Sequence, residues 1–202
     1  KNDEQQAIDI NQNFANYDLF AVSEIKLSEK FTVRPGVRYS IQSKFDNQYA
    51  ASLGLRYLLP KDLEARFSLG KSYRDPNCDE MFTYFVDSNH NMTGNQDLIP
   101  EASTSYEFNI KKSSFYQSGI KLRHNLSATF MNVDDRISLV LNQVTPTLSY
   151  KYLNIDSYKM WNLATSHQLQ YGNWTSKLGM SLIGVSQKIN LPALAASSDD
   201  KF

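Results

Sequence analysis

The stretch "YAASLGLRYLLP", residues 49–60, alternates apolar side chains with small or charged ones along almost its whole length. All its odd positions, from Tyr49 to Leu59, are apolar, and its even positions include Gly54 and Arg56. A period of two is typical of a β-strand, because successive side chains point to opposite faces of a sheet. These residues therefore predict a strand with one apolar face and one polar face.

The same alternation recurs in several other stretches of the chain. It is clear in "FTVRPGVRYSIQ" (31–42), "LEARFSLGKSY" (63–73) and "ASTSYEFNI" (102–110). Each stretch has aromatic and aliphatic side chains at one parity, and mainly small, polar or charged residues at the other. We expect eight strands, near 15–27, 31–45, 48–60, 63–75, 101–113, 118–134, 149–171 and 174–189.

The expected connections alternate between short and long. We place the short turns at 28–30, 60–62, 114–119 and 172–173. Longer excursions cover 76–100 and roughly 135–148. Short turns at one end of the strands and long loops at the other are typical of outer-membrane β-barrels.

The face with the small residues also carries charge. Its charged members include Arg34, Arg38, Arg56, Glu64, Arg66 and Glu107. The core of a β-sandwich would exclude such charges, whereas the water-filled or plugged interior of a membrane barrel accommodates them. We therefore expect an all-β, antiparallel transmembrane barrel segment in which these residues face the lumen. Pro35, His124 and His167 depart from the pattern, because they alternate onto the apolar face.

Composition excludes several other classes of protein. The chain has 202 residues and a mean hydropathy of −0.47. Its net charge is zero, which does not favour a nucleic-acid binder. No apolar run approaches the roughly 18 residues that a membrane-spanning helix needs. Cys78 alone cannot form an intrachain disulfide, and the first residues do not resemble a signal peptide. We expect either a mature chain or a piece of a longer one.

Four sequence stretches resemble a known family. "SLGKSYRDPNCDEMF" (68–82), followed by "GNQDLIPEASTSYEFNIK" (94–111), resembles the mid-barrel motifs of TonB-dependent outer-membrane receptors. "LFAVSEIKLSEKFTVRPGVRYS" (19–40) and "YKYLNIDSYKMWNLATSHQLQYGNW" (150–174) are similar to other strand pairs of that family. The motif residues are Tyr73, Arg74, Pro76, Gly94, Asn95, Leu98, Pro100 and Glu101. The sequence departs from the family pattern at Asp75, where Ala is usual, and at Gln96, where Pro is usual.

The resemblance implies transport rather than catalysis. It implies that residues 1–202 form about eight strands of a 22-stranded barrel in the outer membrane of a Gram-negative bacterium, without the plug domain that precedes the barrel in the family. The expected cargo is a large scarce nutrient: a ferric siderophore, haem or cobalamin. The expected partners are outer-membrane lipid and the energy-transducing TonB complex, which acts through the plug. A surface lipoprotein partner remains open, and nucleic acid is not expected.

Loop 76–100 is expected to be extracellular and to recognise the ligand, since binding residues commonly lie on loops held by a rigid scaffold. The candidates are Phe82, Tyr84, Phe85, Asp87 and His90, with Asp79 and Glu80 as further polar groups. The aromatic side chains would stack on a planar ligand, or would instead pack the loop onto itself. His90 would coordinate haem iron, or would be an ordinary exposed residue. No resident metal or cofactor is expected.

Two rival functions come from other classes. A small structural or adhesive barrel would use the same loops to bind a surface. An outer-membrane barrel hydrolase would need a histidine beside an Asp or Ser. His124 and His167 alternate onto the apolar face, and His90 has no identifiable nucleophile beside it, so no catalytic residue is expected.

Overall fold

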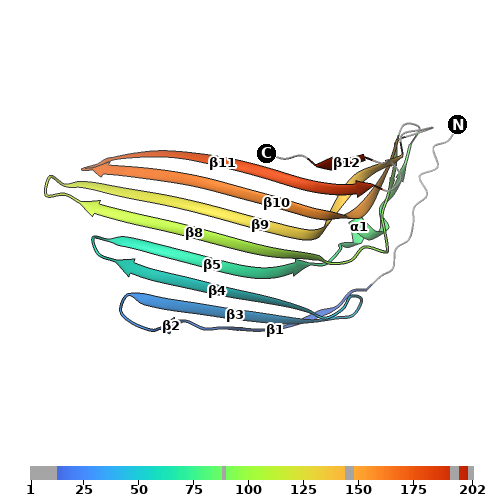
Figure 1. The fold of residues 1–202 in the computed structure, drawn as a ribbon, viewed down its shortest axis with the longest axis horizontal. Coiled ribbons are helices and arrows are strands. Elements are labelled where there is room, and N and C mark those ends of the chain that lie inside the picture. The colour runs from blue at the N-terminus through green and yellow to red at the C-terminus, as the bar shows by residue number, and fades with distance from the viewer. Residues whose placement is uncertain (1–12, 88–89, 144–147, 192–195, 200–202) are drawn as a thin grey trace.

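The computed structural model describes residues 13–87, 90–143, 148–191 and 196–199. They form one sheet, whose main path runs in the order β1-β3-β4-β5-β8-β9-β10-β11-β12 (Figure 1). The bounds on this path are β1 Asn16–Val22, β3 Phe31–Gln42, β4 Gln48–Leu59, β5 Leu63–Arg74, β8 Glu101–Phe115, β9 Ile120–Gln143, β10 Leu148–Tyr171, β11 Trp174–Leu191 and β12 Ala196–Asp199. Neighbours on the path are antiparallel and consecutive in the chain, apart from the short elements between them. The expected all-β antiparallel fold is confirmed.

The connections divide the sheet into two ends. Turns before β3, between β4 and β5, between β8 and β9, and between β10 and β11 lie together at the left of Figure 1, which we call the short-turn end. The opposite, long-connection end carries the segment between β5 and β8. Gly119 (φ +83°) and Gly172 (φ +54°) occupy left-handed positions in two of the short turns. The turns fall where the sequence predicted them.

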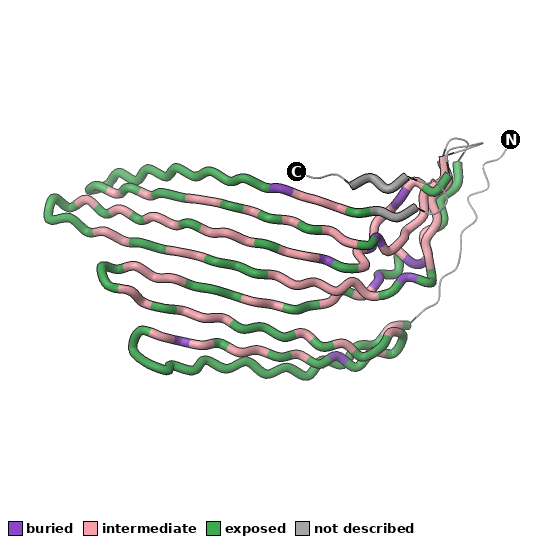
Figure 2. The backbone as a smooth tube through the Cα atoms, in the orientation of Figure 1, coloured by how far each residue is buried: buried purple, intermediate pink, exposed green. Residues whose placement is uncertain are grey.

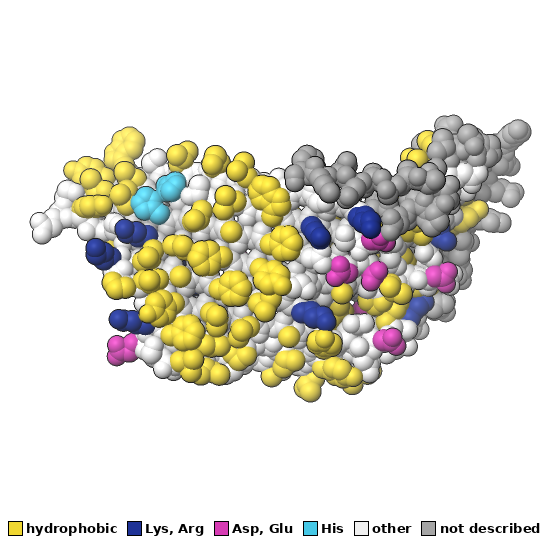
Figure 3. Space-filling view, viewed as in Figure 1, with side chains coloured by type: hydrophobic (Ala, Val, Ile, Leu, Met, Phe, Trp, Pro, Cys, Tyr) yellow, Lys and Arg dark blue, Asp and Glu magenta, His cyan; other side chains and the backbone are white. Residues whose placement is uncertain are grey.

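The two faces of the sheet differ in chemistry. One face, which we call the apolar face, carries cross-strand rows such as Tyr106, Phe130 and Trp161, on β8, β9 and β10. These three side chains are 40–45% exposed. Figure 3 shows a wide field of hydrophobic side chains over the strands. The other, polar face carries rows such as Thr32, Arg56 and Arg66. The alternation of apolar and polar residues in 49–60 thus corresponds to the two faces of one sheet.

Most of the chain is not buried within this sheet. Figure 2 shows exposed and intermediate residues along nearly all the strands. The buried residues Met81, Leu98 and Ile137 form a core cluster at the long-connection end. This is where the segment between β5 and β8 packs on the sheet, so tertiary packing is concentrated around that segment.

Pro35 explains an interruption at the edge of the sheet. β1 ends at Val22 and β2 (Ile25–Lys26) begins three residues later, and both pair with β3. The carbonyl oxygen of Pro35 accepts a hydrogen bond from the Ser23 backbone N–H at 3.1 Å. Because proline has no N–H, the return hydrogen bond cannot form, and the ladder breaks beside it.

The predicted end of the sixth strand was wrong. The sequence predicted a strand to residue 134 and an excursion over roughly 135–148, but β9 continues to Gln143 and pairs with β10 on both sides of Asp135. Asp135 has a φ of +55°, so the strand contains one left-handed residue where the excursion was expected to begin. A polar Asp-Asp pair resembles a turn in sequence, and here it becomes an irregularity inside a strand.

Residues 76–100 contain secondary structure of their own. The segment holds α1 (Cys78–Phe82), β6 (Tyr84–Val86) and β7 (His90–Thr93). β6 and β7 form an antiparallel pair, and β7 also runs parallel to the start of β10, with Leu148 opposite His90. The segment therefore begins after β5 and reaches β10, passing the strands β8 and β9 that lie between them in the sheet.

No helix in the described part of the chain has the length and apolar character to cross a membrane.

The two edge strands of the sheet are not joined to each other. β1 and β12 end the strand order and do not pair, so the described strands form an open sheet and not a closed ring. An open edge presents unpaired backbone N–H and C=O groups, which cannot be satisfied in lipid. The sheet therefore needs further strands to span a membrane.

Candidate functional site

The short helix α1 begins with a capping box, whose residue spacing is visible in the sequence. The Asn77 side chain accepts a hydrogen bond from the Glu80 backbone N–H at 2.8 Å, and a Glu80 carboxylate oxygen accepts one from the Asn77 N–H at 2.9 Å. Two of the free N–H groups at the start of the helix are satisfied in this way. The capping box fixes the position of Glu80 relative to the end of β5.

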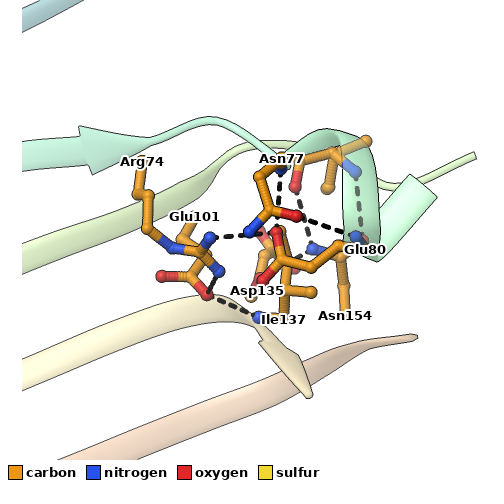
Figure 4. Close-up of polar contacts among 8 residues, drawn as sticks. Arg74, Asn77, Glu80, Glu101, Asp135, Ile137 and Asn154 are labelled. Carbon is orange, nitrogen blue, oxygen red and sulfur yellow. Dashed lines mark hydrogen bonds and ion pairs between the residues drawn. The ribbon is translucent and has the colours of Figure 1, made fainter. Parts of the chain in front are cut away.

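Arg74 connects three parts of the site. Its guanidinium donates to Glu80 of α1 at 3.0 Å and to Glu101 of β8 at 2.5 Å (Figure 4). The same Glu101 oxygen also accepts a hydrogen bond from the Ile137 backbone N–H at 2.7 Å, which ties β9 to the cluster. Charge-assisted contacts of this kind are stronger than neutral ones. Arg74 therefore anchors α1 to the sheet.

Asn154 of β10 makes a second attachment. Its amide nitrogen donates to the Ile99 carbonyl at 2.9 Å and to the Asp135 carbonyl at 2.7 Å, and its oxygen accepts from the Ile99 N–H at 3.1 Å. Figure 4 shows Asn154 and Asp135 in one cluster with Arg74, Glu80 and Glu101. The end of the segment before β8 is thus bonded to Asn154 of β10, which also bonds the left-handed residue of β9.

Gly94 allows the segment to fold tightly onto itself. A Cβ atom at this position would lie 2.5 Å from the Met81 carbonyl carbon and 2.6 Å from the Phe82 nitrogen, both backbone atoms. The Asn95 N–H donates to the Glu80 carbonyl at 3.0 Å. Only glycine lets two backbone segments approach this closely. The family motif around Gly94 therefore has a packing function in this chain.

The eight family-motif residues are brought together at the long-connection end, and their observed contacts are largely structural. Pro76 and Leu98 are buried, and Leu98 belongs to the core cluster with Met81. The Tyr73 ring lies 5.1 Å from the Arg38 guanidinium carbon, and Arg74 and Glu101 form the ion pair described above. Pro100 immediately precedes Glu101 at the start of β8. We refer to the anchored residues 76–100 as the folded loop.

The candidate ligand residues of the folded loop differ in their surroundings. Phe82 packs against the core cluster, with its ring centroid 6.5 Å from that of Phe14 and the Lys44 ammonium 5.4 Å from its centroid. Tyr84 and Phe85 on β6 are 48% and 44% exposed. Asp87 is exposed just beyond β6, and His90 opens β7, where only its backbone position is described. Phe82 is thus occupied in packing, and Tyr84 and Phe85 remain accessible.

Two hollows border the folded loop. One, of about 320 Å³, lies beside the Arg74–Glu101 pair and is also lined by Arg136 and Tyr158. The Arg136 guanidinium carbon lies 3.8 Å from the Tyr158 ring centroid, a cation–π contact. The second, of about 360 Å³, is lined by loop residues 81–84 and 93–97 and by a single β10 residue, Lys151. Both are open to solvent and are large enough for a small-molecule group.

The remaining charged candidates lie along the polar face. Glu64 accepts hydrogen bonds from Arg56 at 2.8 Å and from Arg66 at 2.6 Å, and Arg34 pairs with Glu24. By strand register, Glu107 lies on the same face between Ser68 and Thr129. In the β3–β5 part of the sheet, in-sheet carboxylates therefore neutralise part of the arginine charge.

His124 and His167 meet on the apolar face. They are direct cross-strand partners on β9 and β10, and their Nδ1 atoms lie 2.7 Å apart, so one ring donates a hydrogen bond to the other. The Thr165 hydroxyl lies 3.1 Å from His167 Nε2. The expectation that both alternate onto the apolar face is confirmed, and each imidazole there has a polar partner. Among the described residues, no group of three or more His, Cys, Asp or Glu side chains could hold a metal ion.

Sequence reasoning missed the residues that fasten the folded loop from other strands. Asn154 and Asp135 lie far from the two motif boxes in the chain. The local sequence of Asn154 is that of an ordinary strand residue, and the Asp134–Asp135 pair resembles a turn. The Asn77–Glu80 capping box could have been found, because its spacing is a known start of a helix. Its location inside a stretch rich in loop-forming residues concealed it.

The family model described as TonB dependent receptor-like, beta-barrel matches residues 3–195. By sequence, no curated protein matches the chain. Among solved structures, the hemophore receptor HasR of Serratia marcescens, in complex with its hemophore HasA and heme, matches with a TM-score of 0.77 and 16% identity over 87% of this chain and 35% of that one. The ferric enterobactin receptor PfeA of Pseudomonas aeruginosa, in complex with enterobactin, matches with a TM-score of 0.67 and 19% identity. This match covers 84% of this chain and 27% of that one.

The copper transporter OprC matches with a TM-score of 0.70 and 15% identity, over 86% of this chain and 30% of that one. At these identities the similarity shows the fold, and the chain spans about a third of the length of the solved chains, or less. The family match extends over almost the whole chain and agrees with the strand order, the short turns and the two-faced sheet. The chain therefore belongs to the family of TonB-dependent receptor β-barrels.

Proposed function

We propose that residues 1–202 form part of the wall and the ligand-recognition loop of an outer-membrane receptor that imports a large scarce nutrient. The observation that carries this proposal is the folded loop, anchored by Arg74 and Asn154 to one end of a sheet with an apolar and a polar face. A rigid wall that holds a preformed loop suits the capture of a ligand from outside.

The two faces give the orientation. The apolar face, with exposed Tyr106, Phe130 and Trp161, contacts outer-membrane lipid. The polar face, with Arg34, Arg38, Arg56, Glu64, Arg66 and Glu107, lines the lumen. The short-turn end then lies in the periplasm, and the long-connection end with the folded loop faces the outside of a Gram-negative cell.

The proposed ligand class is a ferric siderophore, haem or cobalamin. The relatives whose names mention heme and enterobactin support an iron-containing ligand, and the copper transporter shows that the same fold is found with other cargo. Tyr84 and Phe85 are the accessible aromatic groups of the folded loop and would stack on a planar ligand. Asp87 and His90 stand beside them in the sequence and would supply polar contacts.

Energy for transport would come from the TonB complex of the inner membrane, acting through a domain in the lumen. Family membership supports this partner, since the family is named for its dependence on TonB. A surface lipoprotein would have to contact the long-connection end, where the folded loop lies. Transport by these parts requires no catalytic residue in the chain.

The test uses the full-length receptor expressed in a strain that lacks it. Uptake of radiolabelled iron as ferric siderophore or as haem, and of labelled cobalamin, is measured with and without a functional TonB complex. We expect TonB-dependent uptake of one of the three, weakened about tenfold or more by Tyr84→Ala with Phe85→Ala, as loss of stacking contacts would give.

Phe115→Ala is the matched control, because Phe115 is an exposed aromatic residue at the short-turn end. It should leave uptake unchanged. Equal uptake of all three ligands with and without the TonB complex would contradict the proposed function.

A further inference from the structure

Two histidines and a lysine form one polar row across the apolar face. Strand register places Lys112 of β8 opposite His124 of β9, and His124 opposite His167 of β10. Figure 3 shows histidine side chains in cyan toward the short-turn end, among hydrophobic side chains and with Lys or Arg side chains in dark blue nearby. Polar and charged side chains are costly on a lipid-facing surface unless they have partners. The row therefore requires a polar partner in its surroundings.

The histidine pair leaves one ring nitrogen without a partner among the described residues, His124 Nε2. The Nδ1 atoms of the two rings lie 2.7 Å apart, and the Thr165 hydroxyl lies 3.1 Å from His167 Nε2 and 3.3 Å from the Asn125 carbonyl oxygen. When this hydroxyl donates to His167, His167 donates through Nδ1 to His124, and His124 Nε2 is an N–H donor. When it donates to Asn125 instead, a proton bound at His124 Nε2 makes the pair cationic. Both arrangements can offer an N–H group to an anion.

Lys112 brings a positive charge to the row without a counter-charge. It is exposed, and it forms no ion pair in the part of the chain that the structure describes. Asp62 lies in the adjoining turn, where its carbonyl accepts the Ser113 N–H at 3.1 Å, but its carboxylate does not pair with Lys112. The neighbouring apolar-face positions of β8 and β9 are uncharged: Ile110, Ser114, Leu122 and Leu126. The chemistry of the row therefore suits an anionic group.

The row lies within reach of one membrane–water interface. Tyr171 and Trp174, a cross-strand pair beside the β10–β11 turn, are 55% and 81% exposed. Aromatic side chains gather at the interfaces of membrane barrels. His167 precedes Tyr171 by four residues, which is about 13 Å along a strand and less in depth, because barrel strands are tilted. Lysine side chains in this position extend toward the headgroups, so an anionic headgroup is the nearest counter-charge that lipid can supply.

A hollow of about 340 Å³ lies further along the same strands on the apolar face. Its lining on this face is Phe67, Tyr106, Phe108, Ala128, Phe130, Trp161 and Leu163. The rest of the lining is Glu107, Thr129 and Asn162, which alternate onto the polar face. Ala128 follows His124 by four residues on β9, about 13 Å along the strand. Since the acyl layer of one leaflet is about 15 Å thick, a chain whose headgroup lies at the row would reach the hollow.

We propose that Lys112, His124 and the hollow over Ala128 form a binding site for one anionic phospholipid of the periplasmic leaflet. The phosphate would accept hydrogen bonds from the Lys112 ammonium and from His124 Nε2, and one acyl chain would lie across the hollow. The proposal rests on the apolar face being the lipid face and on the short-turn end lying in the periplasm, as the proposed function has it. It is independent of the imported nutrient.

The experiment mixes the full-length receptor, in detergent micelles, with phosphatidylglycerol or with phosphatidylethanolamine. Native mass spectrometry then counts the phospholipid molecules that stay bound. We expect one bound phosphatidylglycerol, retained about fivefold more than phosphatidylethanolamine, whose own ammonium group is repelled by Lys112. Lys112→Gln and His124→Gln should each lower this retention about fivefold. Lys111→Gln is the matched control, since Lys111 is the adjacent residue but lies on the polar face opposite Asn125, and it should leave retention unchanged.

A second pair of variants tests the hollow without changing a charge. Ala128→Phe would fill the space between the neighbouring aromatic side chains, and it should lower the retention of phosphatidylglycerol about threefold, because the acyl chain loses its buried contacts. Ala51→Phe is the control. Ala51 lies on the apolar face of β4 and does not line the hollow, so this variant should retain the phospholipid fully.

Three results would overturn the proposal. One is equal retention of phosphatidylglycerol by the receptor and by Lys112→Gln. Another is displacement of the phospholipid by an equal concentration of inorganic phosphate, which would identify a site for a free anion. The third is a receptor dimer without bound phospholipid that Lys112→Gln dissociates, which would identify a second copy of the chain as the occupant. Loss of nutrient uptake with phospholipid retention intact would instead reject the proposed function and leave the lipid site standing.

Discussion

Arg74 is the residue on which the attachment of the folded loop depends most. It bridges Glu80 of α1 and Glu101 of β8, and Glu101 in turn accepts a backbone hydrogen bond from β9. The Arg74 side chain is 44% exposed, so solvent weakens each ion pair. Its structural value lies in joining three chain segments at one point.

Replacing Arg74 by Gln in the full-length receptor should loosen α1 without unfolding the barrel. We expect about 1 kcal/mol of local stability to be lost, which corresponds to about fivefold faster amide hydrogen exchange in residues 77–83. Arg56→Gln is the control, because it breaks a similarly exposed pair with Glu64 far from the loop. Unchanged exchange in Arg74→Gln would show that the ion pairs do not hold the loop.

At the scale of residues, sequence reasoning identified the motif positions but not their contacts. Arg74, Gly94 and Glu101 were recognised by resemblance. Only the folded chain shows that Arg74 pairs with Glu101 and that Gly94 packs closely on the backbone of α1. The pairing of His124 with His167 depends on the register between β9 and β10. Register is set by the whole sheet, and a single strand does not reveal it.

At the scale of elements, β9 shows how one residue redirects a strand. Asp135 has a left-handed backbone, which non-glycine residues adopt at a cost, and its carbonyl accepts the Asn154 amide. The Arg136 side chain, which follows it, stacks on Tyr158 beside the hollow near Glu101. This irregularity places groups from β9 next to the folded loop.

Substitutions at Asp135 should separate backbone conformation from side-chain chemistry. Asp135→Gly removes the strain of the left-handed conformation and should leave stability unchanged or raise it slightly. Asp135→Val, with a β-branched side chain, should lower the free energy of unfolding by about 1–2 kcal/mol. The measurement is denaturant unfolding of the full-length receptor in micelles. Equal stability of the two variants would contradict a left-handed residue at this position.

Alternation predicted the long strands well because both faces of each strand have a strict chemical requirement. Seven of the eight expected strands have counterparts whose ends differ by only a few residues, with β1 and β2 together matching the first. The end of β9 and the elements inside residues 76–100 were missed. There the backbone follows tertiary contacts, such as β7 beside β10, and local sequence gives little indication of them.

At the scale of the whole molecule, the described strands form an open sheet with two free edges. Residues 1–202 expressed alone in detergent should therefore not form a compact barrel. A closed barrel resists unfolding in SDS until it is heated, and its migration on a gel changes on boiling. We expect the same migration before and after boiling, because the free edges leave the backbone unsatisfied. A heat-dependent shift would instead support a small self-contained barrel.

The division into a lipid face and an interior face is the claim on which every functional proposal above rests. Leu163 and Asn162 are adjacent in β10, and register places Leu163 on the apolar face and Asn162 on the polar face. A nitroxide label can be attached at either position in the full-length receptor once Cys78, the free cysteine, is replaced by Ser.

The decisive measurement is the accessibility of these two labels in lipid bilayers to oxygen, which concentrates in lipid, and to a water-soluble nickel chelate. The label at Leu163 should be relaxed strongly by oxygen and hardly by the chelate, and the label at Asn162 should lack this lipid-type response. Equal responses, or the reverse assignment, would contradict a barrel wall with its apolar face in the membrane.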